Sequence, residues 1–357
     1  MTPPNAFPFD YEVPRHLVAQ EPLRHRADAR LMVVDRHRQE ILHHHVRDLP
    51  HLLPPGDRLV LNDTKVVPAQ LAGRRSGTGG RWQGLFIEAT PEGHWKILCK
   101  TRGRLEPGET VVLTDREGRP GPKLWLIERL EEGQWLAHTE TEEPTEAVLD
   151  RLGRVPLPPY IRGGNMTDAD VTSYQTVYAD KPGAIAAPTA GLHFTKELIK
   201  ALEARGVDYS RITLHVGLGT FRPIESESWD QHRMHGETGE ITATAATEIN
   251  RTRTEGGRVI AVGTTVTRLL ETAVRADSTD TRSRELKPWK GETDLFIRPP
   301  FEFRAIDALM TNFHFPRTTL LILVQTFGGW ELIAEAYRQA IKEEYRFYSY
   351  GDAMLIV

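Results

Sequence analysis

The stretch RVIAVGTTVTRLLETAV, Arg258 to Val274, contains a short apolar run, a glycine turn and an amphipathic continuation. The run before Gly263 predicts a buried strand, and the apolar residues after Thr264 recur at helical spacing. Strand, tight turn and helix in this order form the unit from which α/β domains are built.

The same alternation continues on both sides of this stretch. Upstream it predicts a helix from a cap at Thr195 to Gly206, a strand over Tyr209–Gly217 and a helix ending at Gly256. Downstream, AIDALMT, TLLILVQTF, WELIAEAYRQAIKEEY and DAMLIV predict a strand, two helices and a last buried strand. Near the N-terminus, RLMVVDR and RLVLNDT predict two buried strands, and HHH between them predicts a solvated turn. The polar stretch Arg275–Thr293 predicts a loop.

A different pattern fills the chain from Val66 to Arg154. Segments such as RWQGLFIEAT, HWKILCK and KLWLIER alternate apolar with polar residues, and short turns separate them. About 90 residues of this pattern predict a small barrel rather than a sandwich. The expected fold is therefore multidomain. Residues 1–65 and 155–357 form an α/β catalytic domain, and residues 66–154 form an inserted all-β barrel domain.

Composition limits the class of protein. The 357 residues contain 39% hydrophobic and 26% charged residues, which is ordinary for a soluble globular protein. The longest apolar run is far shorter than the ~20 residues that span a bilayer, and no signal peptide is evident. One cysteine, Cys99, excludes an intramolecular disulfide and a cysteine-rich metal site. We therefore expect a cytoplasmic protein with no membrane partner. The net charge of −4 leaves a nucleic-acid partner possible, because what matters is a local basic face.

Several loops are dense in chemically capable residues. NDTK follows a buried strand, where α/β folds place ligands, although an Asx turn explains it equally well. APTAGLHFT precedes a helix. The segment either binds an anion at the helix N-terminus or serves only as the helix cap. In LHVGLGTFRPI, His215 alternates with apolar neighbours, and Gly217 and Gly219 permit close approach of a ligand. The cluster His232, His235 and Glu237 resembles a metal site only superficially, and we expect no metal.

Three further segments complete this set. TNFHFPRTTL places polar groups before a very apolar helix, which is typical of a ligand platform. VGTTVTRLLE has two threonines at a helix start, and SYGDAM precedes the last strand. No dinucleotide fingerprint and no phosphate-binding loop of the Walker type is present.

Taken together and in order, these segments resemble one family. The matching motifs are FDYEVPRHLVAQEP at Phe9, VLNDTKVVPA at Val60, RVPLPPYI at Arg154, YQTVYA at Tyr174, AAPTAGLHFT at Ala186, TLHVGLGTFRPI at Thr213, MHGE at Met234, VIAVGTTVTRLLE at Val259, TNFHFPRTTLL at Thr311 and YRFYSYGDAMLI at Tyr345. The chain resembles the S-adenosylmethionine:tRNA ribosyltransferase-isomerases of queuosine biosynthesis. CKTRGRLEPGE replaces a more usual Lys-Pro-rich run of the family. Arg317-Thr318-Thr319 and Val324-Gln325-Thr326 also depart from the family's common pattern.

The resemblance implies an unusual transferase. S-adenosylmethionine would donate its ribosyl group to the aminomethyl nitrogen of 7-aminomethyl-7-deazaguanine at the tRNA wobble position. The product would be epoxyqueuosine in tRNA, with adenine and methionine released. S-adenosylmethionine is then a consumed substrate, and no other cofactor is expected. We expect a monomer, with an α/β main domain and an inserted β-barrel.

Residue types and loop positions assign expected roles. The catalytic candidates are His215, His193, Asp63 and Glu237. The substrate-binding candidates are Lys65, Thr189, Gly217, Gly219, Thr264, Asn312, His314, Arg317, Tyr350 and Asp352. Histidines titrate near neutral pH and suit proton transfer. Arg102 and Arg104 in the insert are expected to contact tRNA phosphate, and a structural role for His215, bonded to a carbonyl, stays open.

Two other functions are compatible with parts of the pattern. An S-adenosylmethionine-dependent RNA methyltransferase would share cosubstrate and partner but would release S-adenosylhomocysteine. A non-catalytic RNA-binding protein would use strand aromatics such as Trp82, Trp95 and Trp125 on the barrel. The polar loops of the α/β part would then have no purpose.

Overall fold

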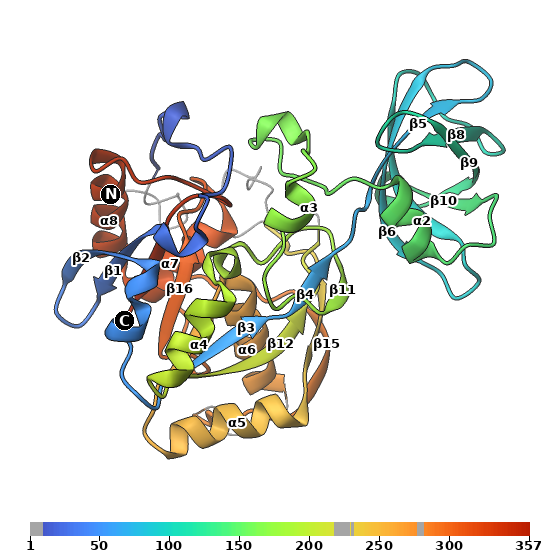
Figure 1. Cartoon of the computed structure of the whole chain (residues 1–357). Helices are drawn as coiled ribbons and strands as arrows, with labels where there is room; N and C mark the ends of the chain where they lie inside the picture. Colours follow the sequence, from blue (N-terminus) through green and yellow to red (C-terminus); the bar gives the residue numbers. More distant parts are fainter. Residues whose placement is uncertain (1–9, 218–228, 230–231, 277–281) are drawn as a thin grey trace. The chain divides into compact units, whose positions relative to one another are not determined.

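The computed structural model describes residues 10–217, 229, 232–276 and 282–357. Contacts divide the chain into two compact units. The first combines Met1–Lys65 with Ser173–Val357, and the second is Val66–Thr172. Figure 1 shows the first as a large sheet with helices and the second as a small β-barrel with the helix labelled α2.

The first unit is built on a nine-stranded mixed sheet with the order β15-β13-β12-β3-β14-β16-β17-β1-β2. The strands are β1 (Arg30–Asp35), β2 (Glu40–His45), β3 (Arg58–Asn62), β12 (Asp208–Leu214), β13 (Glu237–Ile241), β14 (Val259–Val262), β15 (Trp289–Thr293), β16 (Ala308–Asn312) and β17 (Ala353–Ile356). The helices of this unit are α1 (Leu49–Leu52), α4 (Lys196–Ala204), α5 (Ala243–Thr254), α6 (Thr264–Ala276), α7 (Thr319–Gly328) and α8 (Trp330–Lys342). A short sheet, β4 (Thr64–Val66) with β11 (Lys181–Ala184), stands apart.

The centre of the large sheet consists of parallel strands covered on both faces. β12, β3, β14 and β16 run parallel to one another, and every residue of β3 is buried. Alternate residues such as Leu59 and Leu61 share one core with Leu198 and Leu202 of α4. α6 packs against β3, β12 and β14 from outside that core. This double covering explains why these strands are apolar throughout their length.

The second unit is a closed six-stranded barrel. Its strands, in the order β10-β7-β6-β5-β8-β9, are all antiparallel. Trp82, Trp95 and Trp135 fill its interior, whereas Trp125 is 43% exposed on the outer surface. The strands are β5 (Gln70–Arg75), β6 (Arg81–Ala89), β7 (Trp95–Thr101), β8 (Thr110–Thr114), β9 (Pro120–Arg129) and β10 (Gln134–Thr139), followed by α2 (Thr145–Leu152). α3 (Asp170–Ser173) precedes the return to the first unit. The predicted α/β fold with an inserted all-β barrel is confirmed.

Two local predictions were wrong. His43, His44 and His45 lie on strand β2 rather than in a turn, because they pair with Met32, Leu31 and Arg30 of β1. The stretch Arg275–Thr293 is not one loop, since α6 continues to Ala276 and β15 occupies its other end. The two missed strands, β2 and β15, are the edge strands of the nine-stranded sheet.

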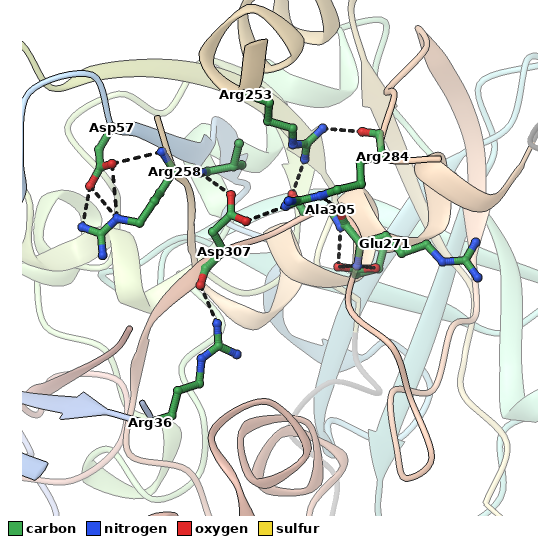
Figure 2. Close-up of polar contacts among 10 residues, drawn as sticks. Arg36, Asp57, Arg253, Arg258, Glu271, Arg284, Ala305 and Asp307 are labelled. Atoms are coloured by element: carbon green, nitrogen blue, oxygen red, sulfur yellow. Dashed lines mark hydrogen bonds and ion pairs between the residues drawn. The ribbon is translucent and has the colours of Figure 1, made fainter. Parts of the chain in front are cut away.

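Charged side chains hold the sheet together at the amino ends of its parallel strands (Figure 2). Asp57, just before β3, accepts hydrogen bonds from the Arg258 guanidinium just before β14, the shortest 2.6 Å long. Asp307, just before β16, accepts from Arg284 at 2.5 Å and from the Val259 backbone at 2.8 Å. Arg36 donates to the Asp307 carbonyl at 2.7 Å. These charges neutralise one another at this edge.

No helix among the described residues is both long and apolar enough to cross a membrane.

Candidate active site

The candidate site lies at the carboxyl ends of the parallel strands, opposite the ion pairs of Figure 2. Since β12, β3, β14 and β16 are parallel, the residues that follow them reach one edge of the sheet. Those residues begin at His215, Asp63, Gly263 and Phe313. Four of the polar segments singled out in the sequence therefore meet at this edge.

His215 follows β12 directly, and two neighbours fix its ring. Its Nδ1 lies 2.8 Å from Oγ1 of Thr64 on β4. A Cβ added to Gly183 would lie 2.8 Å from the same Nδ1, so the ring rests on the glycine backbone. Burial lowers the pKa of His215, an effect that the negative charge of Asp63 partly opposes. His215 is thus a neutral, oriented and partly exposed imidazole at neutral pH.

Asn62 and Asp63 connect β3 to β12. Asn62 donates to the Leu214 carbonyl at 2.9 Å and accepts from the Leu214 amide at 3.0 Å. The Asp63 carboxylate accepts the Thr213 hydroxyl at 2.6 Å. Burial raises the pKa of Asp63, and the hydrogen bond from Thr213 opposes that rise. Both side chains therefore fix the backbone that carries His215.

A second group of side chains surrounds the end of β16. The Thr189 hydroxyl donates to the side-chain oxygen Oδ1 of Asn312 at 2.8 Å. Asn312 Nδ2 lies 3.3 Å from His193 Nε2 and 3.1 Å from the Tyr348 carbonyl. Thr189 and His193 lie on a short 3-10 helix, Thr189–His193. Burial, and then the charge of Arg26, lower the pKa of His193 to about 4, so this imidazole is neutral.

His314 is buried, and both its side chain and its backbone form hydrogen bonds. Its Nε2 lies 2.7 Å from the Thr311 hydroxyl, and its backbone amide donates to the Tyr337 hydroxyl at 2.9 Å. The Tyr11 hydroxyl donates to its carbonyl. Burial lowers the pKa of His314 to about 3. Among His193, His215 and His314, His215 alone is more than slightly exposed.

Glu237 and Arg268 form a buried ion pair beneath Gly217. One Glu237 oxygen accepts the Gly217 amide at 3.0 Å, and the other accepts Arg268. Arg268 also donates to the carbonyls of Leu295 at 3.0 Å and Thr293 at 3.2 Å. Glu237 is therefore placed to hold the backbone after His215. Gly219 lies outside the described residues.

The remaining predicted residues differ in their surroundings. Thr264 is buried and is the first residue of α6, after Gly263 at a φ of 105°. Lys65 and Arg317 are exposed, and Arg317 has a φ of 56°. Tyr350 is buried and packs edge-on against Tyr174 at 5.8 Å. It also lines a small pocket with His193, Arg26 and Ser349.

The Asp352 carboxylate joins two backbone segments. Its two carboxylate oxygens accept the backbone amides of Arg30 at 2.9 Å and Arg346 at 2.8 Å. The carboxylate thereby ties the start of β1 to the turn before β17. This side chain fixes the segment that carries Tyr350.

The sequence prediction missed three residues of this site. Thr64 lies between two chosen residues and was not chosen itself, and the structure shows its hydrogen bond to His215. Gly183 has a φ of 145°, which the sequence alone does not disclose. Arg26 donates to the carbonyls of Gln175 at 2.8 Å and Ser173 at 3.1 Å, and so anchors the segment beside Tyr174. A search for polar residues near the ends of strands could have found Thr64, but it could not have found the other two.

Among the described residues no group of three or more histidine, cysteine, aspartate or glutamate side chains is arranged to hold a metal ion. His232 and His235 lie in an irregular segment just before β13.

Comparison with known proteins gives a consistent result. The family model described as "Queuosine biosynthesis protein" matches residues 7–356. A Symbiobacterium thermophilum protein named S-adenosylmethionine:tRNA ribosyltransferase-isomerase is 47% identical over 350 residues, which is 98% of each chain. A protein of the same name from Moorella thermoacetica is 46% identical over 349 residues, also 98% of each chain.

A solved structure agrees with these relatives. The crystal structure of S-adenosylmethionine tRNA ribosyltransferase from Thermotoga maritima is 36% identical and covers 98% of this chain and 99% of its own. The TM-score is 0.56. The similarity therefore extends over both the sheet and the barrel.

Proposed function

This chain belongs to the S-adenosylmethionine:tRNA ribosyltransferase-isomerase family of queuosine biosynthesis, and we propose that its reaction takes place at the carboxyl edge of the nine-stranded sheet. It is a transferase, and RNA methylation and non-catalytic RNA binding are not favoured. One observation carries the assignment of the site: the oriented His215 and the Asn312 group occupy ends of parallel strands in the same sheet.

The proposed substrates set the chemistry that the site must supply. S-adenosylmethionine donates its ribosyl group to the aminomethyl nitrogen of 7-aminomethyl-7-deazaguanine in tRNA, and the ribose rearranges to the epoxycyclopentanediol of epoxyqueuosine. The sulfonium acidifies the neighbouring 5′-hydrogens of the ribose, so a base can remove one. The attacking amine must be neutral, and the departing adenine needs a proton or a hydrogen-bond donor. Adenine and methionine are the other products.

His215 is the proposed base. The Thr64 hydroxyl can accept Nδ1–H, and that tautomer leaves Nε2 with a free lone pair. Because burial lowers the pKa, the imidazole stays unprotonated at neutral pH. Asp63 would stabilise the positive charge of the sulfonium or of protonated His215.

We assign His193, as a neutral imidazole, to donate a hydrogen bond to the departing adenine. The Thr189 hydroxyl and the Asn312 amide form a hydrogen bond with each other, and the same groups could form hydrogen bonds with the hydroxyls of a ribose. His314 would support this region by fixing the loop after β16. Each of these roles follows from hydrogen-bonding capacity and position at the sheet edge.

The amino-acid end of S-adenosylmethionine is assigned to α6. Free backbone N–H groups at a helix N-terminus attract carboxylates, and Thr264 adds a hydroxyl there. Gly217 and Gly219 would border the ligand, and Glu237 would hold Gly217 in place. Tyr350 would contact the substrate, and Asp352 would hold the backbone segment that carries Tyr350. Lys65 and Arg317 would contact a carboxylate or a tRNA phosphate.

We further propose a cytoplasmic monomer that needs no cofactor. The proposed substrates, tRNA and S-adenosylmethionine, are found in the cytoplasm, and the proposed chemistry involves no net electron transfer. Gel filtration with light scattering would measure the mass of the particle.

The reaction is tested by incubating the chain with tRNA that carries the 7-aminomethyl base and with S-adenosylmethionine. Nucleoside mass analysis should detect epoxyqueuosine, and free adenine should appear in equal amount. Transfer of label from the cosubstrate methyl group into tRNA would reject ribosyl transfer.

A further inference from the structure

The outer surface of the barrel carries a cluster of like charges that the catalytic site does not explain. Arg74 on β5 and Arg81 on β6 are direct cross-strand partners, and both are exposed. Side chains in such a pair have Cβ atoms about 5 Å apart, and two like charges there destabilise the sheet. Folding alone therefore does not favour this pair.

The next strand extends the cluster. β7 pairs with β6 in antiparallel register, with Lys100 opposite Gln83 and Thr101 opposite Trp82. The next residue along the chain, Arg102, therefore comes opposite Arg81. Lys100 and Arg102 are exposed. We call Arg74, Arg81, Lys100 and Arg102 the basic band. Among the described residues, no carboxylate lies within 4 Å of a charged nitrogen of these four side chains.

Several other arginines of the same unit have acidic partners. Arg119 reaches Asp115 at 2.6 Å, and Arg151 reaches Glu143 at 2.6 Å. Since the whole chain has a net charge of −4, the basic band is a local excess of positive charge and not a result of composition. A local positive surface on an acidic protein is what a polyanionic partner requires.

The end of the band is held in place before any partner binds. Arg75 donates to the carbonyls of Arg102 at 3.1 Å and Arg104 at 3.0 Å while it pairs with Glu109 at 2.7 Å. The Thr101 hydroxyl donates to the Arg81 carbonyl at 2.8 Å. Since the backbone is already fixed here, binding needs to order only the side chains.

We propose that the basic band binds phosphates of the tRNA substrate. Arginine side chains form paired, charge-assisted hydrogen bonds to phosphate oxygens, and several of them on one surface would follow a nucleic-acid backbone. This inference rests on the proposed function, because it takes tRNA as the polyanion. It assigns tRNA positioning to the barrel and leaves the reaction to the sheet.

The test replaces Arg74 and Arg81 together by glutamine, which removes both charges and keeps much of the side-chain length. Binding of a full-length tRNA transcript is measured by fluorescence anisotropy from 50 to 300 mM KCl. Kd at ~150 mM should rise roughly tenfold or more, and the slope of log Kd against log salt should fall by about two. The matched control, Arg119→Gln with Arg151→Gln, removes two exposed charges from the same unit and should change neither quantity.

Unchanged affinity and slope in the first variant would overturn the proposal, and so would an equal loss in the control. If Arg74→Gln with Arg81→Gln does not fold, Lys100→Gln with Arg102→Gln tests the same surface on its other strand. The proposed function is tested separately, since wild-type protein that binds tRNA but releases no adenine would reject the reaction and leave the binding result intact.

Discussion

At the scale of single residues, His215 differs from the two other candidate imidazoles in exposure. His193 and His314 are buried and hydrogen-bonded through Nε2, whereas His215 is partly exposed and held through Nδ1. A base must reach its substrate, so exposure and orientation favour His215. Sequence alternation placed it on a strand, and the structure places it one residue beyond β12, where the edge opens.

His215→Asn should reduce turnover roughly 100-fold or more, because asparagine keeps a polar side chain but cannot take up the proton. Melting temperature and tRNA affinity should stay near wild type. Adenine release under single-turnover conditions measures the step. Near-normal turnover in a folded variant would assign the role of base to His193 or His314. A large decrease in melting temperature would instead indicate that His215 has a structural role.

If His215 is the base, its pKa sets the pH at which kcat/KM decreases on acidification, the acid limb of the pH profile. Since burial lowers the pKa of His215, half-loss of kcat/KM on acidification should occur below pH 6.5, the ordinary pKa of histidine. Asp63→Asn removes a charge that raises this pKa and should move the limb to still lower pH. Rates across pH 5–8 measure both limbs, and a limb above pH 6.5 in the wild type would contradict the assignment.

Gly183 offers a test of positioning. Gly183→Ala places a methyl group 2.8 Å from the His215 ring, so the ring must move. A displacement of about 1 Å can cost roughly 100-fold in rate. Gly108→Ala is the control, because Gly108 has a φ of 85° and open space around its Cβ position. Equal turnover in the two variants would show that the contact with Gly183 does not position His215.

At the scale of elements, the buried pair Glu237–Arg268 joins β13 to α6. Removing one partner leaves the other charge buried, so Arg268→Met should reduce the free energy of unfolding by about 3–5 kcal/mol. Arg268→Met combined with Glu237→Gln should recover part of the loss, because no buried charge then remains. Urea denaturation measures both values. Stability of the single variant equal to the wild type would show that the pair is not needed.

Helices and strands with a clear apolar periodicity could be predicted from the sequence. Strands that form only because a neighbouring strand pairs with them could not. α4, α5, α6 and the strands β3 and β14 follow from apolar periodicity and from caps such as Thr195. β2 carries three consecutive histidines, and only its pairing with β1 makes it a strand. Likewise, the loops after β3 and β12 were singled out by composition, but the contact of Thr64 with His215 depends on the meeting of distant strands.

At the scale of the whole molecule, buried neutral histidines link stability to pH. The folded pKa values of His193 and His314, about 4 and about 3, lie below the ordinary 6.5, so the unfolded chain binds more protons below that pH. Their contribution to stability is complete above pH 6.5 and decreases as the pH falls toward 4 and 3. Calorimetry from pH 4 to 8 should show this decrease, and His314→Gln should make it shallower. An unchanged slope in that variant would contradict a neutral buried His314.

The absence of a metal requirement is a further prediction for the whole enzyme. The proposed mechanism uses proton transfer and hydrogen bonds alone, so turnover should survive treatment with a chelator followed by gel filtration. Loss of activity that a specific transition metal restores would show that His232, His235 and Glu237 had been misinterpreted.

The central claim is that S-adenosylmethionine reacts at the carboxyl edge of the nine-stranded sheet. A crystal structure of this protein with bound S-adenosylmethionine tests it most directly. The prediction is that the sulfonium and ribose lie within reach of His215, with the ribose near Thr189 and Asn312 and the carboxylate near Thr264. A cosubstrate bound on the barrel, or at the amino edge beside Asp57 and Arg258, would contradict the claim.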